Sequence, residues 1–123
     1  MKRGNAREST ASLAWRLAVA SQDIGAAIPY YGAPPQPIDE VQKITAAVLA
    51  FYGETDQRLT STEPTSEAAM KQYHKTFDFK IYPGAGHAFN DNTGRGYNAE
   101  AAADAYRLSL AWFAKYVGAP KKA

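Results

Sequence analysis

Two glycine-containing turns carry the side chains of this sequence that are best suited to chemistry. GETD (53–56) presents Asp56, and PGAGHAFND (83–91) presents His87. An aspartate that orients a histidine, which then takes a proton from a hydroxyl or a thiol, forms two thirds of a nucleophilic triad. In hydrolases built on a parallel sheet the order along the chain is nucleophile, acid, histidine, and Asp56 precedes His87. The alternative is a turn-forming aspartate and a histidine that hydrogen-bonds within its loop.

The strands that must position these turns can be recognised from their patterns. AAVLAFY (46–52) is continuously apolar, which is typical of a strand covered on both faces of a parallel sheet. FDFKIY (77–82) alternates and predicts a half-exposed strand. AAIPYY (26–31) predicts a strand that lies at an edge, is bulged, or ends at Pro29. Because ligands bind at the C-terminal ends of strands in open parallel sheets, both turns lie where a site is expected.

Two apolar stripes at helical spacing are each expected to face the core. One lies in SLAWRLAVAS (12–21), with Ser12 as a candidate N-cap. The other lies in the last helix, which Asn98 is expected to cap. The two stripes comprise Leu13, Leu17 and Ala20 in the first helix, and Tyr106, Leu110, Phe113 and Val117 in the last.

Further helical segments are predicted at 38–44 and at 63–75, between the strands. Strands that alternate with helices indicate an α/β fold of three layers, with a short, mostly parallel sheet of about three strands flanked by helices. We expect one domain over 1–123, with a polar N-terminal tail at 1–11 and the folded part at 12–118.

Composition excludes several classes of site and partner. The 123 residues include no cysteine, which excludes disulfides, thiolate metal sites and a cysteine nucleophile. His74 and His87 are the two histidines of the sequence, too few for a multi-histidine metal site. A net charge of +2, with scattered basic residues, argues against nucleic-acid binding. The sequence has no apolar run long enough for a membrane helix and no visible secretory signal, so a cytoplasmic protein is expected.

Several motifs in order resemble the C-terminal half of the dienelactone hydrolase family, a branch of the α/β-hydrolases. They are AVAS…AAIPYYG, VLAFYGETD, FKIYPGAGHAFND and YNAEAAADAYRLSLAWF, which together span about 13–117. The resemblance implies a partial α/β-hydrolase fold and hydrolysis of lactones or carboxylic esters, with no metal or organic cofactor. It also implies that Asp56 is the acid and His87 the base of a triad. Arg95, in TGRG, is a candidate for binding a substrate carboxylate, against the alternative of a solvent-exposed arginine.

The sequence departs from the family at the nucleophile. By resemblance, the nucleophile is a cysteine on a sharp turn before the helix that ends in RLAVAS, and the aligned residues 6–10 read AREST. Ser9 and Ser12 are the candidate substitutes. Ser9 stands beside Arg7 and Glu8, whereas the strained turn that presents a nucleophile needs small neighbours. We therefore expect a retained acid and base without their nucleophile, and no turnover by the chain alone.

About half of the family's chain, upstream of the resemblance, has no counterpart here. The sheet would therefore be cut beside 26–31, leaving an uncovered edge with apolar flanks. We expect a homodimer or higher oligomer formed through the edge at Ala26–Tyr31 and the helix at Ser12–Ser21. Three functions stay open: an inactive hydrolase relative that self-associates, an esterase with a nucleophile from Ser9, Ser12 or a partner chain, and a non-catalytic binding or interaction module that uses the cleft near Asp56 and His87. A small ester or lactone is the candidate ligand.

Overall fold

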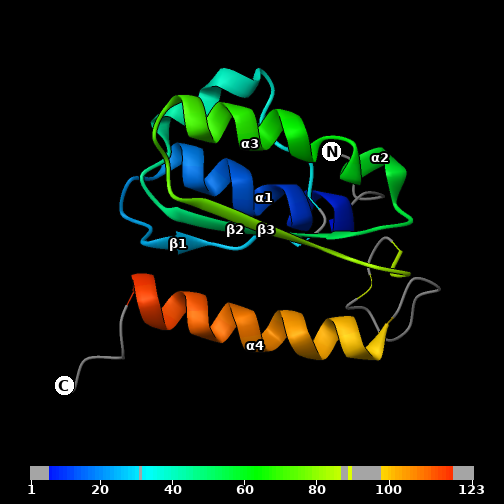
Figure 1. Cartoon of the computed structure of the whole chain (residues 1–123). Helices are drawn as coiled ribbons and strands as arrows, with labels where there is room; N and C mark the ends of the chain where they lie inside the picture. Colours follow the sequence, from blue (N-terminus) through cyan, green and yellow to red (C-terminus); the bar gives the residue numbers. More distant parts are fainter. Residues whose placement is uncertain (1–5, 31, 87–88, 90–97, 118–123) are drawn as a thin grey trace.

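The computed structural model describes residues 6–30, 32–86, 89 and 98–117, and these form three layers (Figure 1). Helices α1 (Ala6–Ala20) and α3 (Glu63–Gln72) lie on one face of a sheet, and α4 (Ala99–Tyr116) covers the other (Figure 1). The three-layer α/β architecture predicted from the alternation of strands and helices is confirmed.

Within the described part of the chain, the sheet has three parallel strands in the order β1-β2-β3. They are β1 (Ala26–Ala27), β2 (Ala47–Gly53) and β3 (Phe77–Tyr82). Every residue of the central strand β2 is buried, as its unbroken apolar run predicts. The short edge strand β1 ends before Pro29, whose carbonyl accepts a hydrogen bond from the Phe51 N–H. A proline has no N–H to continue a ladder, so the predicted end of this strand is confirmed.

Shorter elements connect the layers. The 3₁₀ helix η1 (Ile38–Lys43) occupies the segment predicted to form about two helical turns. One turn of helix, α2 (Gln57–Thr60), follows β2 directly. Helix α3 has Pro64 in its first turn, where a missing N–H costs no hydrogen bond, and buries Ala69 and Met70.

The core has two parts, one on each face of the sheet. Alternate side chains of β2 serve both parts, because successive residues of a strand point to opposite faces. Trp15, Val48 and Met70 belong to the part under α1 and α3. Leu49 and Phe89 belong to the part that α4 covers. The central strand therefore fixes both layers relative to each other.

The prediction for the first helix is wrong in two respects. Helix α1 begins at Ala6, so residues 6–10 are not a loose tail, and Ser12 lies inside the helix instead of capping it. The buried face carries Trp15 and Ala18, while Leu13 and Leu17 are 40% and 47% exposed. The third member of the predicted stripe, Ala20, is exposed as well. The apolar face of α1 was thus identified, but it does not face the core.

Helix α4 shows the same reversal. Its predicted N-cap is confirmed, since the Asn98 side chain accepts a hydrogen bond from the Ala101 N–H at 2.9 Å. The residues that α4 buries against the sheet are small: Ala101, Ala105 and Ser109. The four large apolar residues predicted to be buried are instead 41–64% exposed: Tyr106, Leu110, Phe113 and Val117. Small side chains allow a close approach to the sheet, and the half-buried Leu108 and Trp112 pack beside them.

Candidate functional site

The turn after the central strand places Asp56 at the C-terminal end of the sheet. The Asp56 N–H donates to the Gly53 carbonyl at 3.0 Å, and the Thr60 hydroxyl donates to the same oxygen at 2.6 Å. The Asp56 carbonyl accepts the N–H of Thr60 at 2.9 Å, which begins α2. The residue is half-buried. Asp56 is therefore held by backbone contacts at the position where the sequence predicts a catalytic acid.

A second turn, after β3, is joined to the first by hydrogen bonds. The Thr55 N–H and hydroxyl both donate to the Ala85 carbonyl at 3.0 Å. The Gly84 N–H donates to Glu54 Oε1 at 2.8 Å, and the Glu54 N–H donates to the Tyr82 carbonyl at 3.0 Å. These four bonds join the segment that contains Asp56 to the segment that leads to residue 87. Glu54 has a positioning role that sequence analysis missed, since an exposed acid in a turn gives no distinctive signal.

Gly53 makes the contact between the two turns possible. A Cβ atom at this position would stand 2.5 Å from the Gly86 carbonyl oxygen and 2.7 Å from that of Ala85. Both obstacles are backbone atoms, so no side-chain rotation relieves the clash. Only glycine allows the two turns to approach this closely.

Phe89 anchors the described part of the chain beyond the second turn. Its ring is fully buried and lies 5.2 Å from the Tyr82 ring and 6.2 Å from the Tyr30 ring, between centroids. Its carbonyl accepts the N–H of Asn98 at 2.9 Å, next to the start of α4. Residue 89 is thus fixed by contacts to the core. An aromatic residue two positions after His87 in a polar loop was the available signal, and sequence analysis did not use it.

The other predicted site residues are placed as follows. His87 and Arg95 lie outside the described residues. Ser9 and Ser12 belong to helix α1, and their backbone is helical. A nucleophile of this type stands on a sharp turn between a strand and a helix. Neither serine occupies such a turn.

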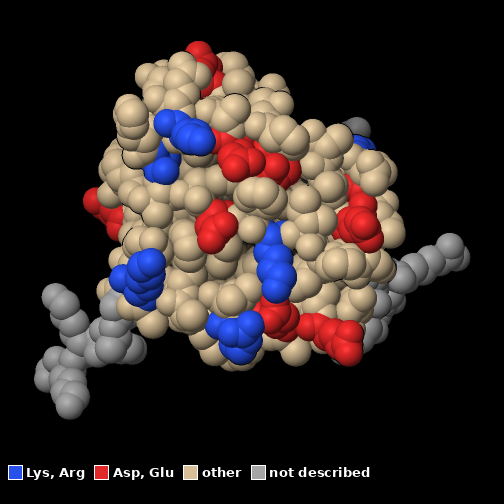
Figure 2. Space-filling model, viewed as in Figure 1, with Lys and Arg blue, Asp and Glu red and all other residues tan. Residues whose placement is uncertain are grey.

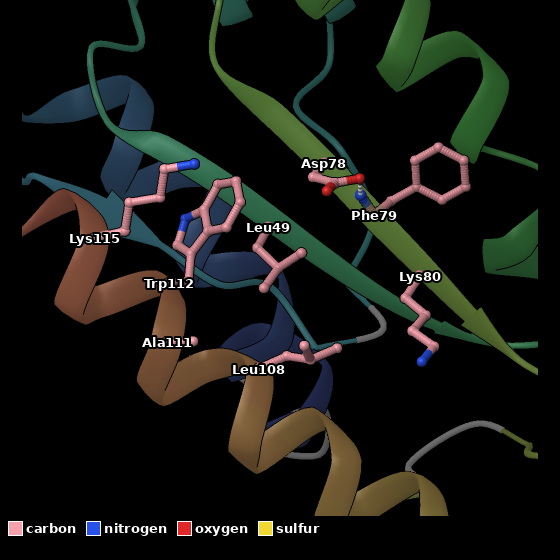
Figure 3. Close-up of a pocket in the computed structure, with 8 residues that line it drawn as sticks. All are labelled: Leu49, Asp78, Phe79, Lys80, Leu108, Ala111, Trp112 and Lys115. Carbon is pink, nitrogen blue, oxygen red and sulfur yellow. Dashed lines mark hydrogen bonds between the residues drawn. The ribbon is translucent and has the colours of Figure 1, made fainter.

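A groove on the molecule lies apart from the two turns that contain Asp56 and lead to residue 87. It lies between β3 and α4 and has a volume of about 240 Å³, below the roughly 300–1,000 Å³ of typical small-molecule sites (Figure 3). Leu49 of β2 and Asp78 of β3 line it away from the C-terminal ends of their strands, together with Trp112 of helix α4. The Trp112 Nε1–H donates to the Ala47 carbonyl at 3.0 Å, and this bond holds the indole ring that lines the groove.

Charged side chains near the sheet mainly hold elements together. Asp104 of α4 accepts hydrogen bonds from Lys80 at 2.8 Å, from the Tyr82 hydroxyl at 2.7 Å and from Arg107 at 2.6 Å. These bonds, that of Lys80 first, hold the pKa of Asp104 well below its usual range. Figure 2 shows acidic and basic side chains interspersed over the face of the molecule seen in Figure 1.

A buried carboxyl group lies on the opposite face of the sheet. Glu63, at the start of α3, is 5% exposed, and burial, together with a hydrogen bond and the charge of Glu67, raises its pKa to about 7. Burial and then the charge of Glu63 also raise the pKa of the Tyr52 hydroxyl. Tyr52 directly precedes Gly53 in the chain, and its side chain belongs to the part of the core under α1 and α3.

No helix in the described part of the chain is long and apolar enough to cross a membrane. Groups of three or more metal-ligating side chains are likewise absent from the described residues.

The sequence of residues 10–117 matches the dienelactone hydrolase family. The chain belongs to this family. A protein of Saccharolobus solfataricus assigned as a carboxymethylenebutenolidase is 40% identical over 94 residues, which are 76% of this chain and 36% of that protein. A protein of Salmonella typhimurium with the same assignment is 30% identical over 116 residues, covering 86% of this chain and 43% of its own length. The chain therefore spans less than half the length of these dienelactone hydrolase relatives.

Solved structures agree with the family assignment. A dienelactone hydrolase assigned in Klebsiella pneumoniae superposes with a TM-score of 0.79 at 31% identity and covers 86% of this chain and 48% of its own. A dienelactone hydrolase-like phosphotriesterase from metagenomic libraries superposes with a TM-score of 0.75 at 19% identity, which shows a shared fold. The chain thus has the C-terminal half of a dienelactone hydrolase fold.

Proposed function

We propose that this chain supplies the acid and the base of an ester- or lactone-hydrolysing site, and that it is inactive by itself. The observation that carries the proposal is the junction of the two turns at the C-terminal ends of β2 and β3. Four hydrogen bonds and the close approach at Gly53 join the turn of Asp56 to the turn that leads to His87. Membership of the dienelactone hydrolase family supports the same roles for these two residues.

In the proposed reaction, His87 accepts the proton of a nucleophile as that nucleophile attacks the carbonyl carbon of the ester or lactone. Asp56 accepts a hydrogen bond from the imidazole and stabilises its protonated form. The tetrahedral intermediate then expels the alkoxide, which takes the proton from His87. A water molecule, deprotonated by His87, cleaves the acyl intermediate and releases the carboxylic acid. Arg95 stays a candidate for binding a substrate carboxylate.

The nucleophile is the part that the chain does not offer. The sequence contains no cysteine. Ser9 and Ser12 have helical backbones within α1, which differs from the strand-to-helix turn of a nucleophile. A base without a nucleophile at its side performs no acyl transfer, and this is why we propose inactivity for the isolated chain.

The first experiment measures hydrolysis of 4-nitrophenyl acetate by the purified chain and by His87→Ala. Both are expected to stay at the buffer rate. Turnover by the wild-type chain that His87→Ala abolishes would contradict the proposed inactivity and favour an esterase. Ser9→Ala and Ser12→Ala would then identify which serine is the nucleophile.

The second experiment tests the acid and base directly. A chimera joins the part of the Saccharolobus protein that precedes its matched segment to residues 10–117 of this chain. The chimera is expected to hydrolyse the ester, and Asp56→Asn or His87→Ala to lower its rate by about 10²–10⁴-fold. Asp78→Asn, an exposed aspartate on β3, is the matched control and should leave the rate unchanged. A folded chimera at the buffer rate, beside an active Saccharolobus protein, would favour a non-catalytic binding module.

A further inference from the structure

The turn at the end of β3 has a central peptide for which two orientations exist. The Ala85 N–H donates to the Tyr82 carbonyl at 3.2 Å and closes the turn, with Pro83 and Gly84 at its two central positions. Gly84 has a φ of +74°, so the turn is of type II. A type I turn closes with the same hydrogen bond, but the peptide between Pro83 and Gly84 is rotated by about 150°.

The residues of this turn and their packing leave both forms open. Proline is common at the second position of both turn types, and glycine accepts either sign of φ at the third. A Cβ atom at Gly84 would meet no heavy atom within 4 Å, so neighbouring groups do not confine the chain at this point. The hydrogen bonds that the turn makes with its surroundings are therefore what selects its form.

Glu54 makes such a hydrogen bond at the middle of the turn. Its Oε1 atom accepts the N–H of Gly84 at 2.8 Å. Rotation of the peptide to the type I form would turn this N–H away and bring the Pro83 carbonyl oxygen toward the side on which the carboxylate lies. A carboxylate accepts hydrogen bonds from an N–H and repels a carbonyl oxygen. The Glu54 side chain therefore stabilises the type II form and disfavours the type I form.

The main chain of Glu54 holds this carboxylate beside the turn. The Glu54 N–H donates at 3.0 Å to the Tyr82 carbonyl, which also accepts the bond that closes the turn. Glu54 thus binds the first residue of the turn through its backbone and the third through its side chain. The two bonds together fix both the place of the turn and the orientation of its central peptide.

The chain that leaves this turn is held closely against the turn after β2. The Ala85 carbonyl accepts the N–H and the hydroxyl of Thr55, both at 3.0 Å. A Cβ at Gly53 would stand 2.5 Å from the Gly86 carbonyl oxygen, so the two turns cannot approach further. A change of φ at Gly84 would therefore have to be absorbed within this short stretch or by the residues that follow it.

We propose that Glu54 is a positioning residue that selects the type II form of turn 82–85 and so holds the segment that leads to His87 in one conformation. Glu54 acts through the Gly84 peptide and not through contact with reacting atoms. A base that must share a hydrogen bond with Asp56 tolerates little misplacement, so a turn with one form favours catalysis. The proposal rests on the proposed function only for this effect on catalysis.

The test uses the full chain, labelled with ¹³C and ¹⁵N, and compares wild type and Glu54→Ala by NMR. In a type II turn the Hα of the second residue lies close to the N–H of the third, and in a type I turn it lies farther away. Wild type should give a strong Overhauser effect between the Pro83 Hα and the Gly84 N–H. Glu54→Ala should weaken it, move the Gly84 amide proton upfield and speed its exchange with solvent about three- to ten-fold, because its acceptor is lost.

Two further variants separate this role from a general loss of structure. Glu54→Gln keeps a side-chain oxygen that can accept the Gly84 N–H, so it should retain most of the wild-type signals. Glu40→Ala removes a partly exposed glutamate that binds Lys43 within η1, and this matched control should leave the Gly84 signals unchanged. A strong Overhauser effect in Glu54→Ala, or equal losses in Glu54→Ala and Glu54→Gln, overturns the proposal. Circular dichroism checks that all variants keep their helical content.

The same variants of the chimera with the Saccharolobus segment measure the effect on catalysis. Glu54→Ala should lower kcat about ten-fold with KM nearly unchanged, and Glu54→Gln should recover most of the rate. An active chimera in which Glu54→Ala leaves kcat unchanged would contradict the positioning role. A chimera that is inactive with Glu54 in place counts against the proposed function alone, and the NMR signals of the full chain still decide whether Glu54 selects the form of the turn.

Discussion

The two edges of the sheet differ in the length of the edge strand and in the side chains that surround it. The β3 edge is six residues long, its exposed positions Asp78 and Lys80 are charged, and Asp104 ties it to α4. The β1 edge is two residues long, and the helices α1 and α4 that contact β1 carry exposed leucine and aromatic side chains. Charged edge residues prevent a strand from pairing with other chains. Within the described sheet, charged side chains thus protect the β3 edge from pairing, whereas no such protection is seen at β1.

The largest expected effect separates the two faces of α4. Ala105 is fully buried, so Ala105→Glu places a carboxylate in the core and should lower the free energy of unfolding by about 3–5 kcal/mol. Leu110→Glu, on the exposed face, should change it by less than about 0.5 kcal/mol. Urea denaturation of the isolated chain measures both. Equal losses would mean that the Leu110 side chain is buried in solution and that the contrast between the edges fails.

The next effect concerns Gly53, where the turn after β2 meets the turn after β3. Gly53→Ala forces a methyl group against two backbone carbonyls and should lower the free energy of unfolding by about 2–3 kcal/mol. Gly84→Ala is the companion variant, since Gly84 has a φ of +74° but open space around it. It should cost about 1 kcal/mol, from backbone strain alone. The reverse order in urea melts would show that close approach is not what joins the turns.

A pH effect of about 2 kcal/mol on the free energy of unfolding is expected from Glu63, the first residue of α3. Its pKa is raised to about 7 in the folded chain by burial, so the folded state holds the proton more tightly than the unfolded state. The stabilising contribution is complete below about pH 4.5 and is lost as the pH rises to about 7. Glu63→Gln should remove this decline in urea melts taken from pH 4 to 8, whereas the exposed Glu67→Gln should keep most of it. A wild-type stability that rises over this interval would contradict the assignment.

The smallest effect is expected at the β3 edge itself. Asp104→Asn weakens the bonds to Lys80 and the Tyr82 hydroxyl, and should cost about 1 kcal/mol, because these groups are partly exposed to solvent. Since the pKa of Asp104 is lowered in the folded state, its contribution is present near neutral pH and is lost as the pH falls below the usual aspartate range. Thermal melts at pH 7 and pH 3 should therefore differ less for Asp104→Asn than for wild type. An unchanged difference would show that Asp104 does not fasten this edge.

Much of the fold could be predicted from local patterns. The unbroken apolar run of β2, the alternation in β3 and the cap at Asn98 each depend on residues close in sequence. The position of Asp56 followed because strand ends and turns are local features too. The close contact of Gly53 with Gly86 was not predictable, since it joins residues far apart in the chain.

The orientation of the two end helices could not be predicted for a different reason. Hydrophobic periodicity detects which side of a helix must be covered, and it carries no information about what covers it. For Leu17 and Leu110 the prediction of burial is wrong, since both side chains are about half exposed in the described structure. The face of each helix that packs on the sheet was decided instead by contacts between residues far apart in the chain, such as that of Trp15 with Phe77.

The rotation of helix α4 about its own axis is set by hydrogen bonds and not by apolar contacts. Rolling this helix about its axis would bring Leu110 or Phe113 against the sheet, and hydrophobic attraction has no preferred direction that opposes such a roll. The hydrogen bonds of Asp104, Ser109 and Trp112 to three separate points on the sheet layer do oppose it, because each tolerates little angular error. Together these three hydrogen bonds fix the helix in one rotational orientation. The apolar side chains of Leu110 and Phe113 consequently stay exposed to solvent instead of turning into the core.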